Sequence, residues 1–214
     1  MKFPVTLPIA TGALSLALAL VPSITSAQVI DYAQADTSSS ASTLVLVSAF
    51  GAGEGADRPA SLLSATYARW STGEAAGVGY VWRRNLLDGK THQWTVGAGI
   101  GANSFHSRVT GDEHRDSSLS GRAQSEWSGP APGGTYYALA QASSFRGSWL
   151  AVAQYSPSAF PVAPEWARYH ERNYQATTVG VGIATGIPRW FLRLGSTRAN
   201  GVSHPYIGVA YNGF

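Results

Sequence analysis

The chain has 214 residues, a formal net charge of +3 and charged side chains at only 13% of its positions. It has no basic cluster with interleaved aromatic residues, which argues against a nucleic-acid partner. The absence of cysteine excludes disulfides, thiolate metal sites and cysteine nucleophiles. Glycine, serine, alanine and threonine replace the missing charged residues, a composition that favours many short strands joined by turns.

The first 27 residues have the pattern of a secretory signal peptide. Lys2 precedes a leucine-rich apolar stretch over residues 9–21, and small residues occupy positions 25–27 before the expected cleavage site. A membrane-anchoring helix is the alternative, but prolines at positions 4, 8 and 22 flank the stretch, which is short for a membrane span. Residues 28–42, which end in a serine-rich run, are expected to form a flexible lead-in.

From residue 43 onward, apolar and polar residues alternate in segments separated by turn signals. These segments predict an all-β fold, an antiparallel up-and-down transmembrane β-barrel over residues 43–214, with about ten strands. Eight strands is the alternative, because residues 105–116 are too many and too charged for a short turn. The expected strands are residues 43–50, 61–71, 75–84, 93–104, 117–127, 134–145, 148–156, 173–184, 189–198 and 203–214.

Loop lengths and tryptophan positions agree with a membrane barrel. Short turns at residues 71–74, 145–148 and 185–188 are expected at the periplasmic end, and longer connections, including residues 156–172, at the other. Six tryptophans lie near strand ends and predict an aromatic belt at each membrane interface: Trp70, Trp149 and Trp190 at one end, and Trp82, Trp94 and Trp127 at the other.

With these tryptophans placed outward, the faces that they share carry no charge, as contact with lipid requires. The opposite faces carry the predicted polar network of the lumen: Arg69, Arg122, Gln124, Glu126 and Arg193. A network of this kind either lines a path for a solute or fills a packed core in which each buried charge has a partner. Polar residues inside and apolar residues outside favour a bacterial outer-membrane location over a soluble β-sandwich or barrel.

Two further groups of residues are candidates for function. Ser104 and His106, near Glu113 and Asp116, have the residue types of a serine hydrolase, but no Gly-x-Ser-x-Gly motif occurs and no acid is assigned. Phe160, Trp166 and Tyr169 lie in the proline-rich segment 156–172, where exposed aromatic residues can contact a glycan or partner or fold back over the barrel mouth. The sequence predicts no metal site, no cofactor and no catalytic residue with an assigned role.

The signal peptide, alternating strands, tryptophan belts and terminal Phe214 together resemble a small outer-membrane β-barrel. Three segments are similar to barrels encoded with exopolysaccharide machinery, such as the cellulose biosynthesis protein BcsS family and YaiO-type barrels: residues 82–84 (Trp-Arg-Arg), residues 168–174 (Arg-Tyr-His-Glu-Arg-Asn-Tyr) and residues 205–211 (Pro-Tyr-Ile-Gly-Val-Ala-Tyr). The resemblance implies a non-enzymatic role in export or surface assembly of a polysaccharide, as in biofilm or cellulose secretion. Its expected partners are outer-membrane lipid and a polysaccharide or its export machinery.

Two other functions stay open: an outer-membrane enzyme hydrolysing lipid or glycan near Ser104 and His106, and a soluble periplasmic β-barrel binding protein. The last strand adds one local prediction. Ile207, Val209 and Tyr211 share a face that excludes Phe214, so a bulge at Asn212 or Gly213 is expected to restore the phase.

Overall fold

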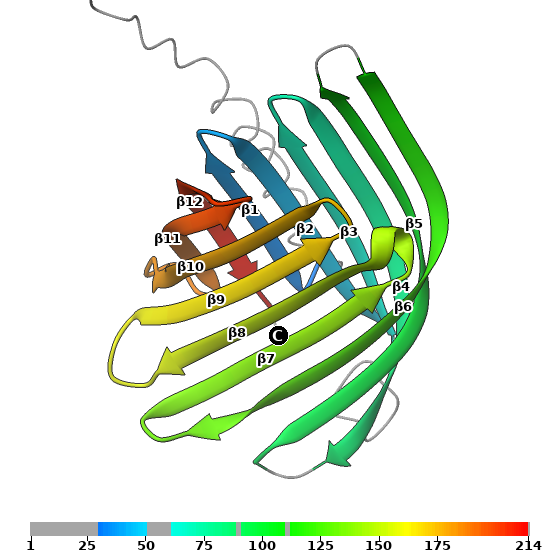
Figure 1. Ribbon diagram of the computed structural model, residues 1–214. Coiled ribbons are helices and arrows are strands. Elements are labelled where there is room, and N and C mark those ends of the chain that lie inside the picture. The colour runs from blue at the N-terminus through cyan, green and yellow to red at the C-terminus, as the bar shows by residue number, and fades with distance from the viewer. Residues whose placement is uncertain (1–29, 51–60, 89–90, 110–111, 214) are drawn as a thin grey trace, which may run out of the picture.

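The computed structural model describes residues 30–50, 61–88, 91–109 and 112–213. Over these residues the chain forms twelve antiparallel strands, each paired with its sequence neighbours, and β1 pairs with β12 to close the barrel (Figure 1). The predicted all-β antiparallel barrel is confirmed, whereas strand numbers of ten and eight are both wrong. Within the described ranges, no helix is long and apolar enough to cross a membrane.

The strands differ in length. They are β1 (Tyr32–Ser38), β2 (Ala41–Phe50), β3 (Ser61–Trp70), β4 (Gly73–Asp88), β5 (Gln93–Val109), β6 (Asp112–Ala131), β7 (Gly134–Ser143), β8 (Ser148–Pro157), β9 (Val162–Glu171), β10 (Tyr174–Ala184), β11 (Trp190–Ala199) and β12 (Val202–Asn212), with a 3₁₀ turn η2 (Phe145–Gly147) before β8. Strands β7 to β12 have 10 or 11 residues, about the length that a tilted strand needs to cross a bilayer.

The two strands missing from the sequence-based count are β1 and β9. Strand β1 lies within the segment expected to be a flexible lead-in, and β9 lies within the segment expected to be a long loop. The predicted signal peptide lies outside the described residues. Strand β9 was hidden because Pro161 and Pro164 suggested a loop; Pro164 is nevertheless part of the ladder, opposite Val181.

The extra strands also change which turns lie together. We call the end of the barrel where β1 begins and β12 ends the terminal end, and the opposite end the far end. The turns before β4 and β8 share the far end, but the connection between β10 and β11, which was expected beside them, lies at the terminal end. Trp190 therefore belongs with Trp94 and Trp127 at the terminal end, and it packs there against Tyr211.

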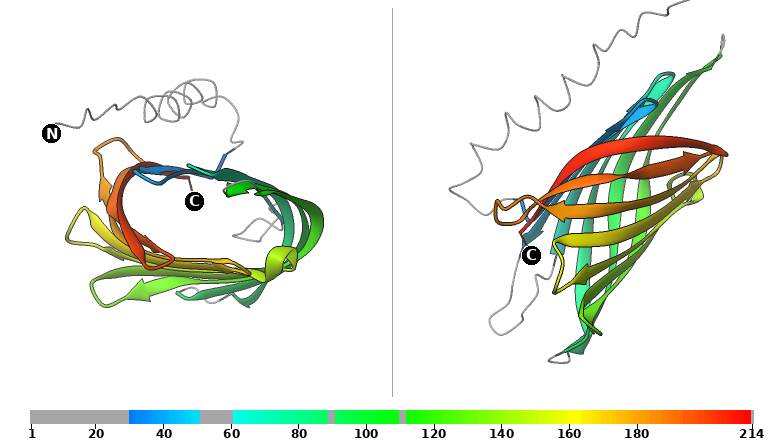
Figure 2. Two further views of the ribbon diagram at one scale, coloured as in Figure 1. Left: turned by 45° about the horizontal axis from the view of Figure 1, so that its top comes forward. Right: turned by 90° about the vertical axis from the view of Figure 1, so that its left-hand side faces the viewer.

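The segment 105–116, which was too long and too charged for a short turn, contains the end of β5 and the start of β6. Strands β4, β5 and β6 have 16, 17 and 20 residues and extend past their neighbours (Figure 2). The β5–β6 hairpin protrudes at the far end, because Ser107 already pairs with Gly73, the first residue of β4. The pairing of β6 with β7 begins only at Arg122, so β6 has one partner strand over most of this protrusion.

The wall has apolar side chains outside and charged side chains inside. Ile100 and Leu119 are 67% and 82% exposed on the outer face, whereas Arg83 and Glu126 are each only 6% exposed within the barrel. Val78 shares a strand face with Trp82, and Leu194 shares one with Trp190, so both were expected to point outward. The exposure of Val78, Trp82 and Leu194 agrees with this expectation. A closed β-barrel with this inverted polarity is the architecture of an outer-membrane protein, in which lipid replaces water around the outer wall.

Strand β12 is regular to its end. Its ladder with β1 continues from Tyr206 to Asn212 without a register shift, and Gly213 donates a backbone hydrogen bond to Asp31 (2.6 Å). The bulge expected at Asn212 or Gly213 is therefore absent. Phe214 lies outside the described residues.

Candidate functional site

The inner wall gathers the charged side chains of the barrel into three groups. Alternation along β6 directs Arg122, Gln124 and Glu126 to the same side. From β6, these side chains contact partners on β3, β4, β5 and β7. The first group lies on β3 to β7, the second spans β9, β11, β12 and β1 around the β1–β12 seam, and the third lies at the far end of the barrel.

Glu126 is at the centre of the first group. It forms a 2.9 Å ion pair with Arg83 of β4, and the two side chains are only 9% and 4% exposed. Gln124 and Tyr137 also donate hydrogen bonds to the Glu126 carboxylate. With this many donors, the cost of burying the Glu126 carboxylate is offset. The members of this group bind one another, and they connect β4, β6 and β7.

Arg193 of β11 is at the centre of the second group. It pairs with Glu165 of β9 at 2.6 Å and with Asp36 of β1. Tyr206 of β12 donates a 2.6 Å hydrogen bond to Glu165, and Gln34 donates to Asp36. Side chains from four different strands are thereby tied together across the seam where the barrel closes.

Arg122 differs from the other inner arginines. It donates hydrogen bonds to Ser64 (3.2 Å), Asn103 (3.2 Å) and the carbonyl of Val78 (3.3 Å), all neutral acceptors. Within the described ranges it has no ion pair, and its buried Nε has no hydrogen-bond partner. Its guanidinium lies along the wall above Gly79 and Gly101, where a Cβ atom would overlap it.

The third group lies at the far end, around η2. Arg146, in a left-handed conformation at φ 54°, places its guanidinium 4.0 Å from the centre of the Phe105 ring. It pairs with Glu171 at 3.3 Å and with Asp116 at 3.9 Å. This arrangement joins β6, β9 and the β7–β8 connection.

The predicted lumen residues fall in different places. Arg122, Gln124 and Glu126 face inward on β6, and Arg193 faces inward at the seam. Arg69 is exposed on the other face of β3, because Ser64, five positions earlier, points inward to Arg122. The error follows from Trp70, which does not join an outer belt but packs inside against Phe105, with ring centres 5.6 Å apart.

The three aromatic residues predicted to form a contact loop do not share a surface. Phe160 is exposed in the β8–β9 connection. Trp166 lies on the outer face of β9, whereas Tyr169 faces inward and donates a 2.9 Å hydrogen bond to Glu171. The segment expected to be a loop, residues 156–172, is mostly strand β9, so these residues point in different directions.

Ser104 and His106 lie on the outer face of the protruding hairpin. Nε2 of His106 is 2.9 Å from Glu113, which also accepts two hydrogen bonds from Arg115 (3.0 and 2.7 Å). These bonds, first those from Arg115, lower the pKa of Glu113 below its usual value. Among the described residues Ser104 makes no hydrogen bond to His106, so a serine–histidine–acid relay is not assembled.

Several inner residues were not predicted from the sequence: Asp36, Arg83, Tyr137, Arg146, Glu165 and Glu171. For Arg83 a signal was present, since it directly follows the outward Trp82 and must face inward in a strand. Asp36 and Glu165 lay in segments that were not expected to be strands, so no alternation was applied to them.

Comparisons with known proteins bear on the fold. No family model matches the chain, and no curated protein matches it. Two solved structures are similar: a KdgM porin (TM-score 0.54, 9% identity) and a KdgM porin in complex with disordered oligogalacturonate (TM-score 0.52, 10% identity). Each match covers 86% of this chain and 98% of the porin. The likeness is one of fold, and the narrower resemblance to the BcsS family or YaiO-type barrels gains no support.

Proposed function

We propose that the barrel is a channel through which short acidic saccharides cross the outer membrane. The observation that carries this proposal is Arg122, a guanidinium on the inner wall that has only neutral hydrogen-bond partners. The likeness to a porin in complex with oligogalacturonate, a chain of acidic sugars, supports the same class of solute.

The charges of the inner wall explain why an anionic solute would bind at Arg122. Arg83, Arg146 and Arg193 each already pair with one or two carboxylates. An incoming anion must displace a partner at those sites, whereas at Arg122 it supplies a missing countercharge. A guanidinium also binds a carboxylate through two parallel N–H donors, a geometry that suits a uronic acid.

Two glycines let the Arg122 side chain lie flat against the inner wall. A side chain at Gly79 or Gly101 would overlap the guanidinium, so with glycine at both positions the arginine lies along β4 and β5 and does not stand across the barrel. A passing solute then meets a charged surface at the wall. The non-enzymatic role expected from the sequence is compatible with this arrangement.

Export of an exopolysaccharide, the role implied by the sequence resemblance, uses the same inner wall in the outward direction. It differs in solute length, since a secreted polymer is far longer than an oligosaccharide. None of the described contacts favours the longer solute. We therefore keep cellulose-type or biofilm export as a prediction and commit to short acidic saccharides.

The test is electrical. The folded mature protein is inserted in a planar bilayer, and its ion current is recorded as trigalacturonate or neutral maltotriose is added. Trigalacturonate should reduce the current at lower concentration than maltotriose. The Arg122→Gln variant should weaken this effect by roughly tenfold or more, as expected for loss of hydrogen bonds to a charged group.

The matched control is Arg84→Gln, which removes one exposed arginine from the outer side of β4. It should leave trigalacturonate block unchanged. Absence of current from correctly folded protein contradicts the channel itself. Equal block of wild type and Arg122→Gln contradicts the role given to Arg122.

A further inference from the structure

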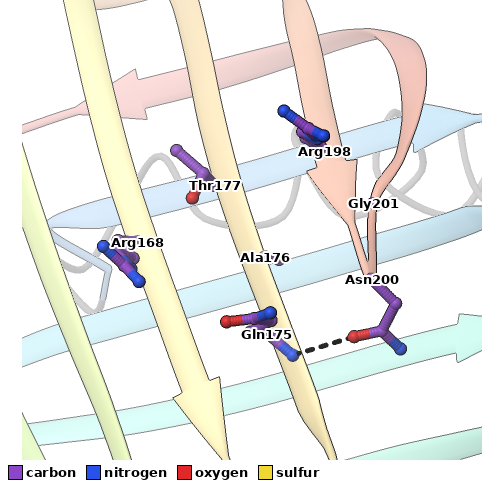
Figure 3. Close-up of a pocket in the computed structure, with 7 residues that line it drawn as sticks. All are labelled: Arg168, Gln175, Ala176, Thr177, Arg198, Asn200 and Gly201. Atoms are coloured by element: carbon purple, nitrogen blue, oxygen red, sulfur yellow. Dashed lines mark hydrogen bonds between the residues drawn. The ribbon is translucent and has the colours of Figure 1, made fainter.

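The outer wall of β9, β10 and β11 carries a row of polar side chains near the far end. Arg168 is directly opposite Thr177 in the β9–β10 ladder, and Thr177 is directly opposite Arg198 in the β10–β11 ladder. Figure 3 shows the two arginines on either side of Thr177, with Gln175 and Asn200 closer to the turns. These residues line a surface hollow of about 280 Å³.

The two arginines have no counterion on this wall. Within the described ranges the Arg198 side chain makes no hydrogen bond or ion pair, and the Arg168 side chain makes only a cation–π contact with Trp149, at 5.8 Å. The carboxylates of β9, Glu165 and Glu171, face inward and pair with Arg193 and Arg146. No carboxylate lies on the outer side of β8 to β12, all of whose residues are described.

The spacing of the row suits a single anionic group. Residues two strands apart in a sheet are separated by roughly 10 Å at the backbone, and two arginine side chains are long enough to meet a common ligand across that gap. Asn200 accepts a 3.2 Å hydrogen bond from the backbone N–H of Gln175 through Oδ1. Its side-chain NH₂ and the Thr177 hydroxyl have no partner among the described residues and can donate.

The wall next to this row is apolar. One step toward the terminal end, the outward residues are Trp166, Val179 and Ser196, and Val179 is 60% exposed. The next outward row adds Val181 and Leu194. A ligand that fits both surfaces has an anionic head at the arginines and a hydrocarbon body along the barrel. That description matches a membrane lipid, because arginines on a barrel wall are tolerated where they reach the headgroup layer.

We propose that Arg168 and Arg198 clamp the phosphate headgroup of an anionic membrane lipid against the outer wall, with Thr177 and Asn200 as neutral donors. The acyl chains lie along Val179 and Leu194. The proposal needs the barrel to be embedded in a membrane, but it is independent of the solute that crosses the lumen.

Native mass spectrometry of the full mature protein tests the clamp. Protein in dodecyl maltoside is titrated with phosphatidylglycerol, with phosphatidylcholine and with inorganic phosphate. Wild type should retain one phosphatidylglycerol at concentrations where neither of the others is retained. The Arg168→Gln/Arg198→Gln variant should weaken that binding by roughly tenfold or more.

The matched control is Arg69→Gln/Arg84→Gln, which removes the same two charges from exposed positions elsewhere. It should bind phosphatidylglycerol as wild type does. Three outcomes overturn the proposal: equal loss in both double variants, which indicates general charge attraction; equal retention of phosphatidylcholine, which indicates acyl contact alone; and equally tight retention of inorganic phosphate, which indicates a free-anion site. Heat-dependent gel mobility establishes that each variant is folded.

Discussion

At the scale of single residues, the inner wall pairs long polar side chains with glycines on neighbouring strands. A Cβ atom at Gly79 or Gly101 would overlap Arg122, one at Gly208 would overlap Asp36, and one at Gly180 would overlap the Tyr206 hydroxyl. The glycines that alternate along these strands therefore provide room for charged groups to lie flat, so that each reaches partners two or three strands away.

This arrangement predicts opposite effects for two similar substitutions. Gly79→Ala pushes the Arg122 guanidinium away from Ser64 and Val78, and loss of hydrogen bonds to a charged group should lower the free energy of unfolding by about 1–3 kcal/mol. Gly121→Ala adds its methyl group to open space on the outer wall. It should be neutral or stabilising by up to about 1 kcal/mol, since alanine loses less conformational entropy than glycine.

Urea titration of folding into lipid vesicles measures both variants. Equal stability of Gly79→Ala and Gly121→Ala would show that Arg122 is not held above Gly79. Arg122→Gln serves as a reference for complete loss of the guanidinium, and Gly79→Ala should add little further destabilisation in that background.

Single residues also show which parts of the inner wall could be predicted from the sequence. Arg122, Gln124 and Glu126 were predicted together because alternation within one strand is visible in the chain. The inward position of Arg83 was readable from Trp82, but its pairing with Glu126 was not, because contact between β4 and β6 depends on the register of two separate ladders. Arg69 was assigned to the wrong face because tryptophan suits both a lipid interface and the packed interior, and Trp70 is in the interior.

At the scale of elements, β1 is the shortest strand and carries little sequence signal. Apart from the tyrosine, its 7 residues, Tyr32–Ser38, are alanine or polar residues, and they resemble a linker. Nevertheless β1 pairs with both β2 and β12, and its Asp36 binds Arg193. This segment becomes a strand because its pairing with β12 closes the barrel. That pairing joins residues far apart in the chain, so local composition does not reveal it.

Deletion of residues 28–38 tests the importance of β1. The shortened chain should lose the heat-resistant folded band on gels, because β2 and β12 each lose a partner strand and unpaired backbone groups are costly in lipid. Deletion of residues 28–30 alone should leave that band intact, since β1 begins at Tyr32. If the larger deletion folds as stably as wild type, β2 must pair directly with β12, and the structural role assigned to β1 is wrong.

At the scale of the whole molecule, the barrel inverts the polarity of a soluble protein. Ion pairs occupy its interior, and exposed leucine, isoleucine and tryptophan cover its outer wall. Ile207 is half exposed at the middle of β12, between Leu194 of β11 and Thr37 of β1. Ser117 also faces outward, but on the hairpin that protrudes at the far end.

These two positions give a depth-dependent prediction. An arginine at Ile207 must lie against hydrocarbon, and Ile207→Arg should reduce the free energy of folding into vesicles by about 2–4 kcal/mol. The same charge at Ser117 stays near water, and Ser117→Arg should cost about 0–1 kcal/mol. Reversible unfolding in guanidinium chloride, followed by tryptophan fluorescence in phosphatidylcholine vesicles, measures both. If the two variants lose equal stability, the outer wall does not face lipid, and a soluble barrel becomes the better description. A large loss confined to Ile207→Arg is expected only if a bilayer surrounds the middle of the strands.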